Sequence, residues 1–423
     1  MHTVTDVSQI FTSGTTGMPK GATFSVSRIL LTGDENDPPS FGGVPGKDVW
    51  YSCMPLYHGT GCILTTANLL RGTGCAIAPR FSVSTFWQDI YDSEATMFIY
   101  VGEIARILLA TPVHPLERAH KLRVMHGNGL RPDVWRKFQE RFNVPEVGEF
   151  FNSSEGVFGL LAYARNDYMN DCVGHHGGLV RLLVRNVYVP VRIDYETGDI
   201  WRDPKTGFAQ RMSYDEGGEI VVAVPSREAF GGYYNNPQAT EKKFATDLFK
   251  KGDLYYRSGD ALRRGPDGHW HFLDRLGDTY RWKSENVSTA EVADVIGKYP
   301  GISEANVYGV EVPGYEGRAG CAAIDARSAE GLDYAGLARH VGQKLPVYAA
   351  PVFIRIVHSS SHIHNHKQNK VGLRKEGVDL DRIGTEEKGG GNDTFLWRKP
   401  GEQSYVPFER KDWETLKRRE VRL

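Results

Sequence analysis

The sequence has 423 residues, of which 40% are hydrophobic, so it is long enough to bury the cores of two or three domains. Its 51 Lys and Arg residues nearly balance 52 Asp and Glu residues, which argues against a general attraction to nucleic acid or to an anionic membrane. The 5 cysteines are scattered and contain no C-x-x-C pair, which argues against a disulfide framework or a cysteine zinc site and favours a reducing compartment.

The first part of the chain predicts strands and helices in alternation. Residues 7–11 are expected to form a strand that runs into a loop rich in glycine and hydroxyl groups, and residues 97–101 and 219–224 predict further strands. A helix face is predicted where apolar residues recur at helical spacing, at Val134, Phe138 and Phe142. Alternation of this kind indicates an α/β fold.

The apolar run from Thr96 to Ala110 is the nearest candidate for a membrane span. Glu103 and Arg106 interrupt it, and no stretch of the sequence reaches the roughly 20 apolar residues that a span requires. We therefore expect this run to be a buried strand that continues into a helix.

A second unit is expected to begin near Asp278. Residues 288–291 form a capping box, and the helix that it starts is expected to bury one face, made of Val292, Val295, Ile296 and Tyr299. The rest of this unit predicts three strands and a helix, at 306–312, 321–326, 351–357 and 338–345. A glycine-rich polar linker is expected at 386–393.

The loop from Thr12 to Gly21 is the strongest indication of chemistry. Its glycines allow backbone N–H groups to approach an anion closely, its hydroxyl groups add donors, and Lys20 completes a cradle for phosphate. The Walker A spacing G-x-x-x-x-G-K-[ST] cannot be placed on this loop. An ordinary surface loop is the alternative, which the specific order of the residues disfavours.

The string from Phe11 to Gly21 resembles the phosphate-binding signature of the adenylate-forming, or AMP-binding, superfamily. Further segments resemble motifs of the same family in order and spacing, at 55–59, 151–156, 230–240 and 256–260. Three more are similar to the very-long-chain acyl-CoA synthetase and fatty acid transport protein group, at 126–132, 274–289 and 315–320. The resemblance covers nearly the whole chain.

The resemblance implies a large AMP-binding domain over residues 1–277 and a small mobile C-terminal α+β domain over 278–383. Residues 384–423 are expected to be a linker and a C-terminal tail. Members of the family carry a further subdomain before the phosphate loop. The large domain is therefore expected to be incomplete and the chain to be N-terminally truncated.

The resemblance also implies the residues that bind ATP and Mg²⁺. The β- and γ-phosphates would be held by Thr12, Ser13, Gly14, Thr15, Thr16, Gly17 and Lys20. Ser154 would donate to the α-phosphate and Glu155 would bind the metal ion, both as catalytic residues. The adenine and the ribose would be bordered by Gly127, Asn128, Gly129, Phe151, Asp260 and Arg275.

Lys367 is the catalytic lysine that the resemblance implies, because residues 363–370 match the spacing of the group's T-G-T-F-K-x-x-K segment. Its cation would bridge the carboxylate and the α-phosphate, and a surface lysine is the alternative. Zinc binding by the neighbouring histidines, from 358 to 366, is disfavoured because no Cys or carboxylate lies among them.

A hinge is implied at Asp278. Rotation there would bring to CoA the segment made of Lys283, Ser284, Glu285 and Asn286, in which Ser284 replaces the glycine usual in the family.

The expected activity is that of an AMP-forming ligase that uses ATP, Mg²⁺ and CoA to convert a long-chain or very-long-chain fatty acid into its CoA thioester, with coupling to fatty acid uptake as an extension. The alternatives are a ligase for another acid, bile-acid-like or specialised, and a non-catalytic nucleotide- or acyl-binding remnant. The residues 421–423 form a weak version of the S-K-L peroxisomal address, so a peroxisomal location, or one peripheral to the endoplasmic reticulum or lipid droplets, is expected.

Overall fold

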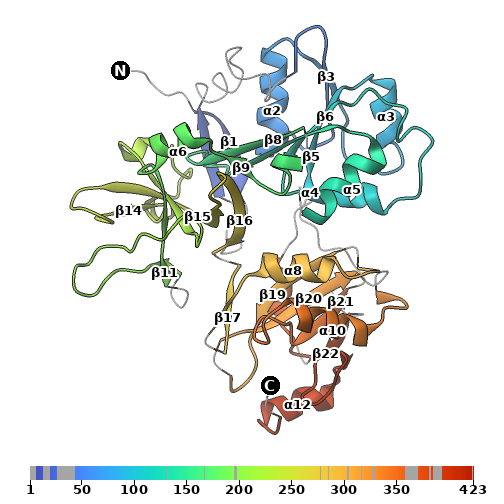
Figure 1. Ribbon diagram of the computed structural model, residues 1–423, viewed down its shortest axis with the longest axis vertical. Helices are drawn as coiled ribbons and strands as arrows, with labels where there is room; N and C mark the ends of the chain where they lie inside the picture. Colours follow the sequence, from blue (N-terminus) through green and yellow to red (C-terminus); the bar gives the residue numbers. More distant parts are fainter. Residues whose placement is uncertain are drawn as a thin grey trace. The chain divides into compact units, whose positions relative to one another are not determined.

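The structure, a computed structural model, describes residues 6–12, 20–25, 43–130, 132–165, 167–194, 198–276, 278–283, 285–302, 304–315, 317–325, 329–357, 370–380, 383, 393–421 and 423. The chain forms two compact units, one of residues 1–192 and 200–272 and the other of residues 193–199 and 273–423 (Figure 1). Across the described ranges, no helix combines the length and the apolar character that crossing a bilayer demands.

One sheet of the first unit has 6 strands in the order β4-β3-β5-β6-β7-β8. Their bounds are β3 (Val49–Ser52), β4 (Gly74–Ile77), β5 (Met97–Val101), β6 (Val124–Asn128), β7 (Glu146–Asn152) and β8 (Gly159–Ala164). All pairs are parallel except β7 with β8. Parallel sheets bury both faces, and every residue of β5 is accordingly buried.

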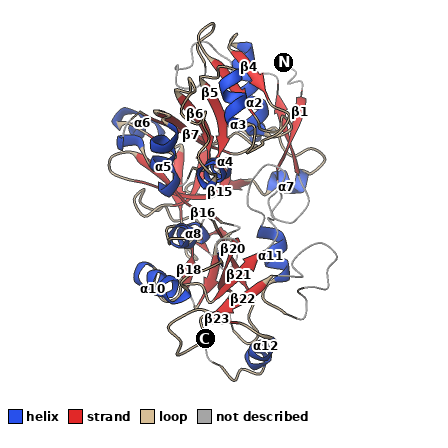
Figure 2. Cartoon of the chain, turned by 90° about the vertical axis from the view of Figure 1, so that its right-hand side faces the viewer, coloured by secondary structure: helices blue, strands red, loops and turns tan. Residues whose placement is uncertain are grey.

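Four helices lie between these strands in the sequence and beside the sheet in space (Figure 2). They are α2 (Gly59–Leu70), α3 (Phe86–Asp92), α4 (Gly102–Ala110) and α5 (Pro132–Phe142). The helix face predicted at Val134, Phe138 and Phe142 is confirmed, since all three residues of α5 are buried in the core under the sheet.

A second sheet of the first unit follows the order β10-β13-β15-β16-β9, and β14 pairs with β15. Its strands are β9 (Gly174–His175), β10 (Tyr188–Val191), β13 (Gly218–Ala223), β14 (Phe244–Thr246), β15 (Leu254–Arg264) and β16 (His269–Arg275). Trp270 and Tyr256 lie fully buried in its core. The boundary between the two units falls inside β16, after Phe272.

Short elements complete the first unit and the crossing to the second. They are β1 (Asp6–Thr12), β2 (Lys20–Ser25), η1 (Asp167–Met169), α6 (Gly178–Val184), η2 (Arg227–Ala229), α7 (Pro237–Glu241), and the hairpin of β11 (Ile193–Asp194) with β12 (Asp199–Ile200).

The second unit contains a 5-stranded sheet in the order β19-β20-β21-β22-β23, in which only β20 and β21 run parallel. Its elements are β17 (Tyr280–Trp282), β18 (Glu285–Val287), α8 (Thr289–Gly297), β19 (Ala305–Val310), β20 (Ala319–Asp325), α10 (Tyr334–Lys344), β21 (Phe353–Val357), α11 (Lys370–Glu376), β22 (Thr394–Trp397), β23 (Val406–Pro407) and α12 (Arg410–Lys417).

The residues expected to form a C-terminal tail belong instead to the core of the second unit. Strand β22 pairs with β21, and its Phe395 and Trp397 are buried. The guanidinium of buried Arg355 on β21 donates to Asp393 at 2.8 Å, so the charge is compensated at the edge of β22. The prediction of a tail is therefore wrong from Asp393 onward, while residues 384–392 lie outside the described ranges.

Candidate functional site

Strands β1 and β2 form the frame of the predicted phosphate loop. They pair antiparallel, and in their register Thr12 lies opposite Lys20, so the loop leaves and re-enters the frame at neighbouring positions. Ser13, Gly14, Thr15, Thr16 and Gly17 lie outside the described residues, as does the side chain of Thr12. The phosphate role of these residues stays a prediction.

The segment 230–240, which resembles a family motif, packs directly against β2. The backbone N–H of Thr23 donates to the carbonyl of Gly232 at 3.1 Å, and that of Tyr234 donates to the carbonyl of Gly21 at 2.8 Å. The Lys20 ammonium lies 5.4 Å from the centre of the Tyr233 ring, within the range of a cation–π interaction. Two motifs far apart in the sequence are thus fixed side by side.

Glu155 joins the same group of residues. It is 7% exposed, and its carboxylate accepts a hydrogen bond from the Tyr233 hydroxyl. Burial acts to raise the pKa of Glu155, but the positive charge of Lys243 and the Tyr233 hydrogen bond outweigh it, and the pKa is lowered. A buried carboxylate is therefore held ionised beside half-buried Ser154, the residue predicted to donate to the α-phosphate.

Lys243 and Tyr233 were not among the predicted site residues. The Lys243 ammonium donates to the carbonyls of Arg257 and Ser258, at 3.3 Å and 3.2 Å. It therefore contacts the Y-x-S-G-D motif of residues 256–260. Tyr233 lies within a recognised motif and could have been selected for that reason. Nothing in the sequence indicates that Lys243 faces Glu155.

Asp260 lies in an irregular part of β15. In the pairing of β13 with β15, Glu219 faces Ala261 while Val221 faces Arg257, so the residues between them bulge out of the ladder. Gly259, in the middle, has φ of 79°, a left-handed conformation that favours glycine. The Ser258 hydroxyl accepts from the backbone N–H of Asp260 at 3.2 Å, and both residues are buried.

The Glu219 side chain holds this bulge in place. Its carboxylate, fully buried, accepts from the backbone N–H of Gly259 at 3.1 Å and forms an ion pair with Arg257 at 2.8 Å. One acid therefore contacts the bulge on both sides of Ser258.

Gly127 and Asn128 occupy the carboxyl end of β6, Gly129 follows directly, and Phe151 lies near the same end of β7. A side chain at position 127 would meet the carbonyl oxygen of Tyr100 at 2.0 Å, so only glycine fits there. In open α/β sheets, ligands bind at the carboxyl ends of parallel strands. The structure thus brings these predicted adenine-bordering residues to one sheet edge.

Glu149, which was also missed by the sequence predictions, supports the sheet edge at Gly127 to Gly129 through hydrogen bonds. It lies opposite Gly127 in the register of β6 and β7, and it accepts from the Tyr100 hydroxyl and from the N–H groups of Gly129, at 2.6 Å, and Leu130, at 3.3 Å. Complete burial raises the pKa of Glu149 to about 8, although these hydrogen bonds act against the shift.

Glu155 fits the role of a single Mg²⁺ ligand, since its buried carboxylate is ionised. In the part of the chain that the structure describes, no group of three or more His, Cys, Asp or Glu side chains is placed to hold a metal ion. The other oxygens would have to come from ATP and water. The histidines from 358 to 366 lie outside the described residues.

The predicted hinge residue Asp278 is tied to α11 within the second unit. Its carboxylate pairs with Lys370 at 3.3 Å and with Arg374 at 2.8 Å, and these cations lower its pKa although burial opposes them. Lys367 lies outside the described residues, just before α11. Arg275 belongs to the second unit, so its predicted place near Asp260 stays a prediction.

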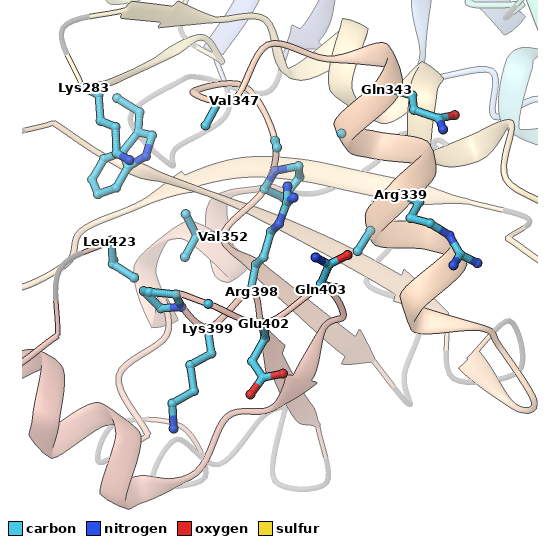
Figure 3. Close-up of a pocket in the computed structure, with 17 residues that line it drawn as sticks. Lys283, Arg339, Gln343, Val347, Val352, Arg398, Lys399, Glu402, Gln403 and Leu423 are labelled. Atoms are coloured by element: carbon cyan, nitrogen blue, oxygen red, sulfur yellow. The ribbon is translucent and has the colours of Figure 1, made fainter.

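Lys283 stands at the turn between β17 and β18, with φ of 52°, on the rim of a pocket of about 640 Å³ (Figure 3). Of the described residues that line this pocket, three more are cations, Arg339 from α10 and Arg398 and Lys399 from the segment after β22, and one is acidic, Glu402. Glu285 and Asn286 follow on β18, and Ser284 lies outside the described residues.

The tripeptide predicted as a peroxisomal address is bound to the second unit by its backbone. The Tyr315 hydroxyl donates to the carbonyl of Val421 at 3.0 Å and accepts from the N–H of Leu423 at 2.7 Å. The address itself stays a prediction.

Comparison with known families and proteins gives a consistent result. The model of the AMP-binding enzyme family matches residues 7–234. The chain is 52% identical over 96% of its length to isopenicillin N epimerase component 1 of Hapsidospora chrysogena, and 40% identical over 98% to a very long-chain fatty acid transport protein of Cochliobolus heterostrophus. It is 38% identical over 88% to a medium/long-chain-fatty-acid–CoA ligase of Mycobacterium tuberculosis.

The chain spans 68%, 64% and 60% of the lengths of these three relatives. Among solved structures, ATP-bound MatB from Rhodopseudomonas palustris is similar with a TM-score of 0.68 at 22% identity, over 88% of this chain and 68% of that one. The α/β architecture predicted from the sequence is therefore confirmed as that of adenylate-forming enzymes.

Proposed function

Because the chain belongs to the AMP-binding enzyme family, we propose that it activates a long-chain or very-long-chain fatty acid as an acyl-adenylate and transfers the acyl group to CoA. The observation that carries the proposal is the group formed by Lys20, Tyr233 and Glu155, in which a cation from the base of the phosphate loop and an ionised buried carboxylate are joined by one aromatic side chain. Two of the three relatives have names that refer to fatty acids, and one name includes CoA ligase.

In the first half-reaction, a carboxylate oxygen attacks the α-phosphorus of ATP and pyrophosphate leaves. Lys20 would neutralise charge on the β- and γ-phosphates, and Ser154 would donate to the α-phosphate, because charge grows on these oxygens in the transition state. When bound, Mg²⁺ would supply further positive charge there. Glu155 would hold it, and Tyr233 would fix the orientation of that carboxylate.

In the second half-reaction, the CoA sulfur attacks the acyl carbon, and AMP leaves. Lys367 is proposed to supply the cation that bridges the carboxylate and the α-phosphate in the first half-reaction. Asp278 is proposed as the hinge whose rotation allows the second half-reaction. The basic pocket beside Lys283 supports a role of this hairpin in binding the phosphates of CoA, because Arg398 and Lys399 line it too.

A second candidate keeps the adenylation step and changes the acid. The name of the relative that is 52% identical refers to isopenicillin N, a compound outside the fatty acids. A specialised carboxylic acid of that kind is therefore the alternative substrate.

The test is acid-dependent exchange of labelled pyrophosphate into ATP, with a panel of fatty acids of different lengths and with isopenicillin N. We expect exchange with long-chain fatty acids, reduced about 100-fold in Lys20→Ala, which removes a positive charge at the β- and γ-phosphates, and in Glu155→Gln, which removes the carboxylate proposed to hold Mg²⁺. Glu94→Gln, which alters an exposed carboxylate in the turn after α3, is the matched control. Exchange with isopenicillin N alone would favour the alternative, and folded protein without exchange for any acid would refute both.

A further inference from the structure

Helix α6 exposes its large aliphatic side chains to solvent. None of its residues is buried, and the exposed fractions are 73% for Leu179, 57% for Leu182 and 70% for Leu183. These positions are i, i+3 and i+4, so the three leucines share one face of the helix. Single exposed leucines are ordinary on a protein surface, whereas a helix face made of them marks a surface that contacts something apolar.

The structure fixes the residues before α6 to the second sheet of the first unit, and the residue after it to the loop that precedes β13. Before the helix, the N–H of His176 donates to the carbonyl of Gly268 at 3.0 Å, and the Trp270 indole donates to the His176 ring at 3.1 Å. After it, the Tyr214 hydroxyl donates to the carbonyl of Arg185 at 3.0 Å. The leucine face is therefore held outward by a rigid support, and both views place α6 at the margin of its unit (Figures 1 and 2).

The surroundings of the leucine face are basic. Residues 172–193 contain no Asp or Glu, but they include Arg181, Arg185 and Arg192. Arg185 is exposed just after the helix, and Arg181 donates to the carbonyl of Pro266. The carboxylate of Asp267, in the turn that receives Arg181, is paired with His269 at 2.6 Å. The segment that carries the leucine face is therefore positively charged, with exposed acids close by at Asp267 and, in the loop of Tyr214, at Asp215 and Glu216.

We propose that α6 is a membrane-contact helix, which lies in the plane of a bilayer with Leu179, Leu182 and Leu183 among the acyl chains and Arg185 at anionic headgroups. A short helix with leucines on one face and arginine at its border has the chemistry of interfacial helices. Long-chain fatty acids partition into bilayers, so contact there would bring the enzyme to its substrate. This reason for choosing a bilayer over a protein partner rests on the proposed function, whereas vesicle binding can be measured without it.

The experiment is flotation of the full chain with vesicles of phosphatidylcholine, alone or mixed with phosphatidylserine. We expect binding to the mixed vesicles, reduced at least about tenfold in the double variant Leu179→Gln/Leu183→Gln, because two side chains lose their apolar transfer. Val113→Gln, which changes an isolated and 81% exposed aliphatic side chain, should bind like the wild type. Arg185→Gln should lose most of the preference for phosphatidylserine.

Circular dichroism would show that the variants fold, which is expected because glutamine is a good helix former at exposed positions. Equal vesicle binding by the wild type and the double variant, or no binding by either, would overturn the proposal. A wild-type dimer that the double variant converts to monomer, without vesicle binding, would also overturn it and identify a contact between copies. Pyrophosphate exchange measured without vesicles tests the proposed function separately, since it does not depend on α6.

Discussion

Glu149 shows how one buried side chain can prepare a binding edge without being part of it. Its carboxylate accepts hydrogen bonds from a tyrosine on β5 and from backbone groups that follow β6. The left-handed conformation of Gly129, with φ of 78°, is thereby held under the predicted adenine position. These hydrogen bonds offset only part of the cost of burying the carboxyl group, so its pKa stays raised.

The pKa of Glu149 makes stability depend on pH. Because the pKa rises to about 8 in the folded chain from 4.5, the folded state binds more protons than the unfolded state between these values, and the free energy of unfolding falls as pH rises. One proton of difference gives a slope of up to about 1.4 kcal/mol per pH unit. Urea unfolding should show that Glu149→Gln, which cannot titrate, removes this part of the slope.

Glu140→Gln is the control for that measurement, because Glu140 is an exposed acid on α5. It should leave the pH dependence of the wild type unchanged. If Glu149→Gln and the wild type lost stability in parallel from about pH 5 to about pH 8, the role assigned to the Glu149 proton would be wrong.

Single site residues were selected from the sequence only where a motif contains them. Glu155 and Ser154 were selected from one motif, and Asp260 from another. Lys243 and Glu149 lie in no recognised motif, and Tyr233 lies in one that does not show its contact with Glu155, 78 positions away in the chain. Local spacing contains no information about which distant side chain will fill a contact.

At the scale of elements, apolar periodicity predicted the regular parts well. The run from Thr96 to Ala110 forms strand β5 followed by helix α4, as expected from a buried strand that continues into a helix. The helix start predicted at Ser288 is confirmed too, because the Ser288 hydroxyl caps α8 by accepting from the N–H of Glu291 at 3.1 Å, which is one of the two hydrogen bonds of a capping box. These signals are local, since a strand or helix start depends on a few adjacent residues.

Strand β22 was missed because it follows a glycine-rich segment and is short. Four residues, Thr394–Trp397, carry too few alternations to be distinguished from a loop. What makes them a strand is the free edge of β21, which offers backbone partners, and the apolar core that accepts Phe395 and Trp397.

The hairpin of β17 and β18 gives a prediction about CoA. Arg398→Ala and Lys283→Ala should each raise the KM for CoA by about fivefold, the effect of one partly exposed charge, and leave pyrophosphate exchange unchanged. The measurement is CoA-dependent thioester formation at saturating ATP and acid. Lys298→Ala, at the residue directly after α8 and outside the pocket lining, serves as the control, and an unchanged KM in both pocket variants would exclude the pocket as a CoA site.

At the scale of the whole molecule, two units with separate cores imply two unfolding events. The core of the second unit includes Trp397, which is 1% exposed. In the first unit, the core packed on the sheet of strands β3 to β8 includes Phe98, which is fully buried. In scanning calorimetry, Trp397→Ala should destabilise only the second unit, by about 3–5 kcal/mol, because it leaves a cavity there. Phe98→Ala should lower only the other transition, and a common shift of both would show that the units unfold as one.

The domain organisation was predictable in outline and not in its limits. The helix and strands from Ser288 to Val357 were expected to form one small unit, and they lie in the second unit together with β22, β23 and α12. The division inside β16 could not be read from the sequence, because a strand that passes between two cores has the same apolar pattern as one that stays in a single sheet.

The contacts of Glu219 with the bulge of β15 predict how a natural variant at position 219 would behave. Aspartate is one carbon shorter than glutamate and cannot reach both the Gly259 N–H and Arg257, so the bulge that carries Asp260 would lose its support on one side. Substitution scores treat glutamate and aspartate as near equivalents, and Glu219 lies in none of the motif segments recognised in the sequence. Neither a substitution score nor a motif search would therefore flag an allele that encodes aspartate at position 219. In a cross or a complementation assay, such an allele would still behave like a lesion of the Y-x-S-G-D motif itself.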